Sequence, residues 1–192
     1  TVTVTNAIAI TGDHDQLTAA LVTGGTKVEV TDATATINDA DATAISATEL
    51  SAIGGATTGT VVVTNAIAIT GDHDQLTAAL VTAGTKVEVS DAAVTINDAD
   101  ATGITAAELS AIGGATTGTV TVTNAIDITG DHDQVTAALV TSGTNVAVTD
   151  ATVTINDADA VAITAAELSA VGGTTTGTVT VTNAVAITGD HD

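Results

Sequence analysis

The stretch TVTVTNAIAITGDHDQ, residues 1–16, decides the fold because the chain returns to it at fixed intervals. Close copies begin at Thr60, Thr119 and Thr178, so each step is 59 residues long. Three complete copies occupy residues 1–59, 60–118 and 119–177, and residues 178–192 open a fourth. A constant period of this size is typical of arrays in which each unit packs against its neighbours. We therefore expect one structure continued along the chain, as a segment of a longer array.

Hydrophobic periodicity changes twice within each copy. Apart from Asn6, residues 1–10 alternate Val or Ile with Thr or Ala, which is the two-residue period of a β-strand. Asp13 and Gln16 then have the spacing of a capping box at the start of a short helix, as do Ser46 and Glu49 in the second half of the copy. Pairs of glycine residues follow both apolar helical stretches in the first copy and are expected to end them.

This pattern predicts a mainly β fold with short helices: a parallel β-solenoid of tandem 59-residue repeats with two coils per repeat. The coils would be roughly 25 and 34 residues long, each running strand, bend, strand and short helix. Equivalent side chains of neighbouring copies would lie two strand spacings, or roughly 10 Å, apart along a single axis.

Composition narrows the function classes. The 192 residues include 23 acidic and 2 basic side chains, for a formal net charge of −21. Two cations cannot neutralise a phosphate backbone, so nucleic acid is not expected as a partner, nor is an anionic membrane surface. No apolar run approaches the ~20 residues that span a bilayer, so membrane insertion is not expected. The hydrophobic fraction of 44% predicts an ordered chain whose core, without aromatics, is thin and aliphatic.

Two Asp-rich turns recur in the copies. Calcium prefers oxygen ligands from carboxylates and amides, and coils stacked in register would bring the two turns within one strand spacing. The sequence therefore predicts calcium as a cofactor, although the spacing matches neither the EF-hand nor the glycine-rich nonapeptide repeat. The alternative is that the first aspartate caps a helix and the other acids are solvated turn residues. The candidate ligands are Asp13, Asp15, Asn38, Asp39, Asp41, Asp72, Asp74, Asn97, Asp98, Asp100, Asp131, Asp133, Asn156, Asp157 and Asp159.

Asparagine and histidine also recur at fixed positions. The asparagines fall at an inward bend of the strand pattern, which predicts a structural ladder of amides bonded to backbone groups. The histidines lie between two aspartates and are predicted to be solvated, and no Ser, Cys or Lys recurs beside them as a nucleophile. Catalysis is therefore not expected, and no catalytic residue is assigned. The asparagines are Asn6, Asn65, Asn124 and Asn183, and the histidines are His14, His73, His132 and His191.

Two phrases carry a resemblance to a known class of protein. They are ITAAELSAIGGATTGTVTVT, residues 104–123, and AITGDHDQLTAALVT, residues 68–82. Both resemble the repeats of very large extracellular and cell-surface proteins of cyanobacteria and related bacteria, in which a short helix is followed by TTG and a Thr/Val strand. The resemblance implies a secreted or surface-bound array and implies no catalytic residues.

These observations predict a structural protein, extracellular or at the cell surface, that self-associates into filaments or sheets as a fibre, sheath or surface layer. The main alternative is the stalk of a cell-surface adhesin whose binding domain and partner lie elsewhere. An ice-binding solenoid is a second alternative, because threonines of residues 1–5 share a face, although Lys27 and Glu29 interrupt it in the next coil. A string of small β-sandwiches is a third, although 59 residues without aromatics are few for that fold.

Overall fold

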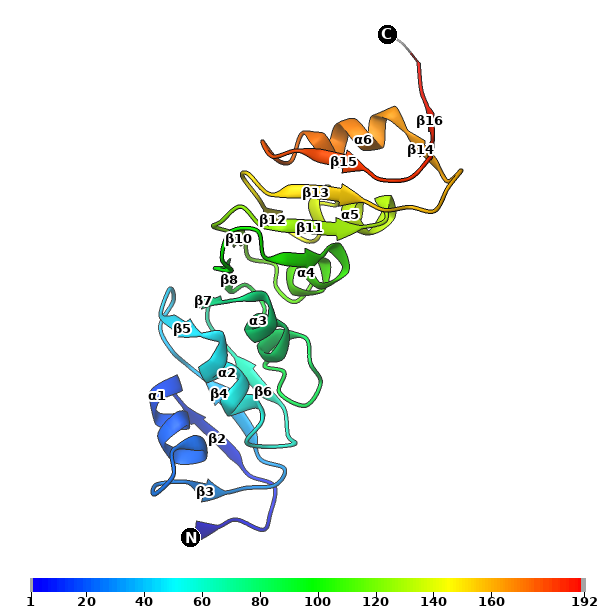
Figure 1. The fold of residues 1–192 in the computed structure, drawn as a ribbon. Coiled ribbons are helices and arrows are strands. Elements are labelled where there is room, and N and C mark those ends of the chain that lie inside the picture. The colour runs from blue at the N-terminus through cyan, green and yellow to red at the C-terminus, as the bar shows by residue number, and fades with distance from the viewer. Residues whose placement is uncertain (1, 191–192) are drawn as a thin grey trace. The chain divides into compact units, whose positions relative to one another are not determined.

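The protein is an α/β chain in which helices and strands contribute nearly equally, 26% and 28% of the residues (Figure 1). The computed structural model describes residues 2–190, and within that range the strands form several small parallel sheets accompanied by six α-helices. The prediction of a mainly β chain folded as a parallel β-solenoid is therefore wrong. Helices are as extensive as strands, and the strands are divided among separate sheets.

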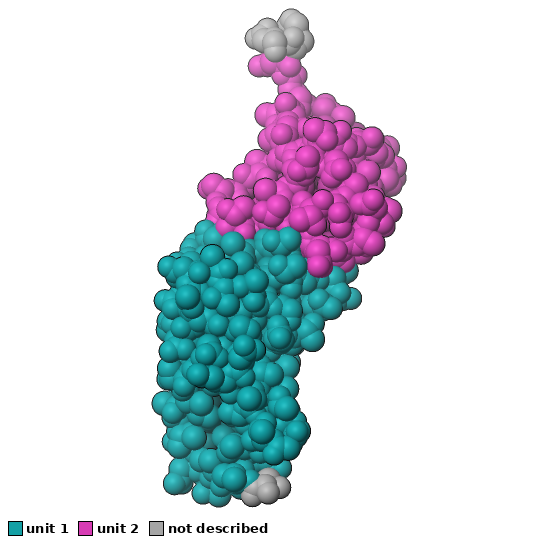
Figure 2. Space-filling model, turned by 90° about the vertical axis from the view of Figure 1, so that its left-hand side faces the viewer, with its two compact units in different colours: residues 1–95, 115–118 teal, residues 96–114, 119–192 magenta. Residues whose placement is uncertain are grey.

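The chain divides into two compact units (Figure 2). The first contains the residues up to Thr95 together with Ala115–Gly118. Its sheets are the pair β1-β3, the three strands β2-β4-β6, and the neighbours β5, β7 and β8 in that order. The elements are β1 (Val2–Thr3), β2 (Ala9–Gly12), α1 (His14–Leu17), a π-helical turn η1 (Thr18–Val22), β3 (Val28–Glu29), β4 (Thr34–Ile37), β5 (Ala44–Ser46), α2 (Ala47–Gly54), β6 (Val61–Val63), β7 (Ala68–Gly71), α3 (His73–Leu80) and β8 (Ala93–Ile96), whose last residue begins the second unit.

The second unit contains Ile96–Gly114 and the residues from Thr119 onward. Its sheets are the four strands β15-β13-β11-β9, the pair β14-β16 and the neighbours β10 and β12. The elements are β9 (Gly103–Thr105), α4 (Ala106–Gly113), β10 (Val120–Val122), β11 (Asp127–Gly130), α5 (His132–Leu139), β12 (Val146–Ala147), β13 (Thr152–Ile155), β14 (Ala162–Thr164), α6 (Ala165–Gly172), β15 (Val179–Val181) and β16 (Ala186–Thr188).

The register of strand pairing explains why the copies do not stack as predicted. Parallel pairs join residues that are 24 to 26 positions apart. Two such steps lead from Ile10 through Ala35 to Val61, an advance of 51 residues, which falls short of the 59-residue repeat. The residue equivalent to Ile10 in the next copy is Ile69, and it pairs with Ile45 instead. Equivalent side chains therefore do not lie over one another two strands apart.

The helix starts follow the local sequence and confirm the predicted capping boxes. The backbone N–H of Gln16 donates to Asp13 Oδ1 at 2.8 Å, and that of Glu49 donates to Ser46 Oγ at 3.2 Å. In both pairs the side chain of the third helical residue accepts from the N-cap backbone in return. Such caps satisfy N–H groups that a helix end otherwise leaves without partners. The same boxes begin α3, α4, α5 and α6.

The core is aliphatic throughout and lies between helices and strands. In the first unit α2 packs against α3, and Leu50 and Ile53 of α2 are fully buried. In the second unit α4 packs against α5, and Leu109 and Ile112 are equally buried. Burying each such side chain contributes roughly 1.5–3 kcal/mol. Among residues 2–190, no helix combines the length and the apolar character that crossing a membrane requires.

Candidate functional site: the histidine–aspartate corners

The two Asp-rich turns of the first copy meet where α1 begins. Pairing of Gly12 with Ile37 aligns the end of β2 with the end of β4. His14 therefore lies beside Asp39, which is 25 residues further along the chain. The Asp39 carboxylate accepts from the His14 backbone N–H at 2.8 Å and lies 2.7 Å from its ring Nδ1. We call this arrangement a histidine–aspartate corner.

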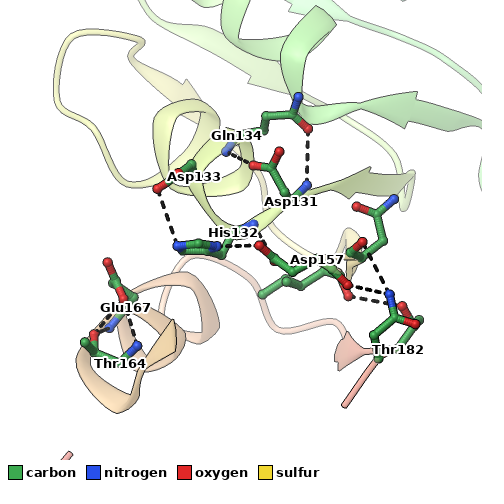
Figure 3. Close-up of polar contacts among 11 residues, drawn as sticks. Asp131, His132, Asp133, Gln134, Asp157, Thr164, Glu167 and Thr182 are labelled. Carbon is green, nitrogen blue, oxygen red and sulfur yellow. Dashed lines mark hydrogen bonds and ion pairs between the residues drawn. The ribbon is translucent and has the colours of Figure 1, made fainter. Parts of the chain in front are cut away.

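The second unit contains the same corner, with matching distances (Figure 3). Asp157 accepts from the backbone N–H of His132 at 2.8 Å, and its other oxygen lies 2.6 Å from the ring Nδ1. A carboxylate can only accept, so Nδ1 carries the proton and donates it to Asp157. The other ring nitrogen, Nε2, lies 3.4 Å from a carboxylate oxygen of Asp133. The exposed fractions are 15% for the His132 side chain, 5% for that of Asp157 and 88% for that of Asp133.

Both imidazoles are held toward the protonated form. Burial by itself lowers the pKa of His14, but the hydrogen bond to Asp39 and the negative charges of Asp39, Asp15 and Glu49 outweigh it, so the pKa is raised above 6.5. The hydrogen bond to Asp157 is the largest influence on His132 and raises its pKa above 6.5. An opposite charge close to a histidine favours its cationic form.

A glutamate on the following helix adds a further negative charge near the histidine of each corner. Hydrogen bonds from the side chain and backbone of Ser46 lower the pKa of Glu49, and the charge of His14 lowers it further. Backbone and side-chain hydrogen bonds from Thr164 lower the pKa of Glu167 in the same way. The lowered pKa favours the charged form of each capping carboxylate, and that negative charge in turn favours protonation of the nearby histidine.

The recurring asparagines bond to these corners from the next segment of the chain. The Asn65 side-chain amide donates to the Asp39 carbonyl at 2.5 Å, and Asn124 does the same to Asp98. Asn183 donates to the Asp157 carbonyl. The amides thus bond backbone groups of a turn, as predicted. Asn65 and Asn124 are half-buried, whereas Asn6 and Asn183, in the first and last copies, are exposed.

The residues predicted to bind calcium have different structural roles. The first aspartate of each copy caps a helix, and the last accepts a backbone N–H from the next segment. Of the buried aspartates, Asp39 and Asp157 form the corners. The caps are Asp13, Asp72 and Asp131; the buried aspartates are Asp39, Asp98 and Asp157, each 6% exposed; the N–H acceptors are Asp41, Asp100 and Asp159; Asp15, Asp74 and Asp133 are 87–88% exposed; and Asn38, Asn97 and Asn156 are exposed at the strand ends.

The corners join the two turns, but they do not bring together a set of side chains that could coordinate a metal ion. Among residues 2–190, no group of three or more His, Cys, Asp or Glu side chains is arranged to hold a metal ion. Calcium binding stays a prediction, and the carboxylates open to an ion from solvent are the exposed ones, such as Asp15 and Asp133.

The prediction that the histidines are solvated turn residues is wrong for His14 and His132, whose side chains are only 16% and 15% exposed. His191 lies outside the described residues. Sequence reasoning missed the pairing with Asp39 although a signal was present. The spacing of 25 residues between His14 and Asp39 recurs between His132 and Asp157 and equals the strand-pairing offset.

A second recurring contact, also missed from sequence, surrounds the Thr-Thr-Gly turn before β6. The Thr57 hydroxyl donates to the Ala33 carbonyl at 2.7 Å, and the Thr58 hydroxyl donates to the Thr31 carbonyl at 2.8 Å. A Cβ atom at Gly59 would overlap the Ala33 carbonyl, so only glycine fits there. The equivalent turns before β10 and β15 make the same threonine contacts.

An open groove in the first unit runs beside this turn. It has a volume of about 460 Å³, and its lining includes residues 54–59 and Lys86. The position of Lys86 is taken by Asn145 in the third copy, so the cation is not repeated. The groove is therefore a weaker candidate for a recurring site than the corners.

The corners are suited to holding chain segments together. The His132 ring and backbone N–H bind one carboxylate, and the ring Nε2 faces a second carboxylate, a setting that favours a protonated imidazole over a general base. Each corner joins the start of a helix to a turn 25 residues away.

Comparison of the chain with profiles of known protein families, with curated proteins and with solved structures found no match.

Proposed function

We propose that this chain is a structural repeat protein that acts outside the cell or at its surface, as part of a fibre, sheath or surface layer. One observation carries the proposal: polar side chains that recur in the copies make hydrogen bonds between segments of the same chain. The corner joins His14 to Asp39 in the first unit and His132 to Asp157 in the second with matching distances. Chemistry repeated in this way supports a mechanical role for each unit.

The Thr-Thr-Gly turns and the asparagine amides add to this support. Both link a segment to one 24 to 27 residues earlier, and both occur in more than one copy. Each copy therefore makes the same kinds of hydrogen bond to the segment that precedes it. The array can be lengthened by further copies without a new type of contact. The resemblance to giant surface-array proteins points to the same role.

The charge of the chain sets conditions for assembly. A net charge of −21 keeps single molecules soluble and makes them repel one another. Salt screens this repulsion over roughly 8 Å at physiological ionic strength. The proposal includes calcium as a bridge between neighbouring molecules through exposed carboxylates such as Asp15 and Asp133.

Assembly is tested by electron microscopy and sedimentation velocity on the purified 192-residue chain, across a concentration series with calcium or with EGTA. We expect fibres, sheets or a ladder of oligomers that grows with concentration. A single monomeric species under every condition would overturn the assembly role and favour the stalk of an adhesin. Protease treatment of intact source cells tests the location, because a surface protein is cleaved without lysis.

A further inference from the structure

The open groove of the first unit differs in charge from the rest of this acidic chain. The chain has 23 acidic and 2 basic side chains, and one of the basic ones, Lys86, lines the groove. The other described residues that line it are glycine, alanine, valine and threonine, none of which carries a charge. A cation among uncharged walls attracts a negative group more strongly than one that neighbouring acids neutralise.

The backbone on both sides of Lys86 is anchored to the end of α3. The Thr85 hydroxyl donates to the Ala78 carbonyl, and the Val87 backbone N–H donates to the Ala79 carbonyl at 2.8 Å. The Val87 side chain is buried, at 1% exposed. Lys86 itself is exposed, so its neighbours fix its place in the groove while its side chain stays open to solvent.

Close backbone contacts hold the walls of the groove. A Cβ atom at Gly54 would overlap the Thr85 carbonyl, so glycine at this position lets the turn before Lys86 approach the end of α2. On the other side, the hydrogen bond of the Thr57 hydroxyl and the tight fit of Gly59 fix the Thr-Thr-Gly turn. The groove is therefore formed before any partner arrives.

The Lys86 ammonium has no partner among residues 2–190. It makes neither a hydrogen bond nor an ion pair with any side chain in that range. Glu88 lines a smaller adjoining hollow together with Lys86, but no ion pair joins the two. An ammonium group offers three donors, so a carboxylate that enters the groove can accept from it directly.

Exposed carboxylates of the same chain supply the matching charge. Each lies in the sequence GDHDQ, directly after the first residue of a helix. One carboxylate oxygen lies 3.4–3.6 Å from the neighbouring histidine Nε2, yet the side chains are 87–88% exposed. A second molecule can therefore reach them without rearrangement. They are Asp15 of α1, Asp74 of α3 and Asp133 of α5.

We propose that the Lys86 groove of one molecule binds the exposed aspartate of a GDHDQ turn in a second molecule. The groove and the turn are different surfaces, so the contact is heterologous and further molecules can add in the same way, as a fibre requires. The contact needs no calcium. The inference rests on the proposed function, because it names a contact through which the structural array grows.

Repulsion between two acidic molecules opposes this contact. Each chain has a formal net charge of −21, and salt at physiological ionic strength screens charges in solvent beyond roughly 8 Å. A pair inside a groove is screened less than charges that face bulk solvent. Association is therefore measured at physiological ionic strength, by sedimentation velocity over a concentration series, with EGTA present to remove bridging by calcium.

Reversal of the groove charge is the first test. Lys86→Glu should raise the dissociation constant at least about tenfold, because it replaces an attraction with repulsion between like charges. Lys27→Glu is the matched control, since Lys27 is exposed, lies in the same sequence GTKVEV and does not line this groove. Both substitutions change the net charge equally, so a general increase in repulsion affects both variants alike.

Neutralisation of the turns is the second test. Removing negative charge lowers the repulsion between molecules, so a variant that nevertheless associates more weakly has lost a specific contact. The turn variant combines Asp15→Asn, Asp74→Asn and Asp133→Asn, and we expect it to associate more weakly than the unsubstituted chain. The control variant combines substitutions at three exposed aspartates that also recur every 59 residues, and it should associate at least as strongly; these are Asp32→Asn, Asp91→Asn and Asp150→Asn.

The outcomes distinguish this contact from the structural role. If Lys86→Glu associates as tightly as Lys27→Glu, or the turn variant as tightly as its control, the groove contact is wrong and the structural role stands. The same conclusion follows if the unsubstituted chain assembles with calcium but is monomeric in EGTA. If it is monomeric under every condition, both proposals fall. Far-UV circular dichroism verifies that each variant is folded.

Discussion

Removal of the carboxylate from one histidine–aspartate corner tests whether the corner stabilises the folded state. Asp157 accepts two hydrogen bonds, from the backbone N–H and the ring of His132, and its side chain is only 5% exposed. Each hydrogen bond to a charged group contributes roughly 1.5 kcal/mol. We therefore expect Asp157→Ala to lower the free energy of unfolding by about 3 kcal/mol. Asp133→Ala is the control, since an ion pair at an 88% exposed carboxylate contributes less than about 1 kcal/mol.

The effect should depend on pH in a direction that the structure sets. The pKa of His132 is raised above its ordinary value of 6.5 in the folded chain, so the folded state binds the proton more tightly than the unfolded state. The stabilisation is fully present below pH 6.5 and is lost as pH rises through the folded pKa. The difference between the unsubstituted chain and Asp157→Ala should therefore be larger at about pH 6 than at about pH 9.

The assay must suit a chain without tryptophan or tyrosine. Urea unfolding followed by far-UV circular dichroism gives the free energy, and hydrogen exchange of peptides covering α5 and β13 assigns the loss to the second unit. An Asp157→Ala variant as stable as Asp133→Ala at the lower pH would refute the reasoning. Equal effects at the two pH values would show that the charge on the imidazole contributes nothing.

Three further predictions concern the turns and the ion. Gly118→Ala should destabilise the first unit by roughly 1–3 kcal/mol in urea unfolding, because the new Cβ would lie 2.7 Å from the Ala92 carbonyl carbon. Gly84→Ala is the control and should have little effect, because the space around Gly84 is open. Ala101→Gly should raise the free energy of unfolding by roughly 0.5–1 kcal/mol, because Ala101 has a φ of 59°; a lower melting temperature would contradict this. Calcium bridging predicts that EGTA lowers the melting temperature or disperses the assemblies, and no change in either would remove the ion from the proposal.

Some of the candidate site follows from the sequence and some does not. Asp13 and Asp131 are predictable as helix caps because their partners, Gln16 and Gln134, lie three residues away. The corner partner of His132 lies 25 residues away, and its identity depends on the register of β11 and β13. A histidine between two aspartates looks solvated in sequence, and only that register places it against a buried carboxylate.

The sequence by itself determined the 59-residue repeat, the helix starts at Ser46 and Asp13, the aliphatic core and the acidic surface, because each depends on composition or on neighbours a few residues apart. Tertiary structure decided how the copies combine. Strands pair at offsets of 24 to 26 residues, and 59 is not a multiple of that step, so successive copies shift relative to the sheets. A repeat fixes which residues recur, but pairing energy between distant strands fixes which of them meet.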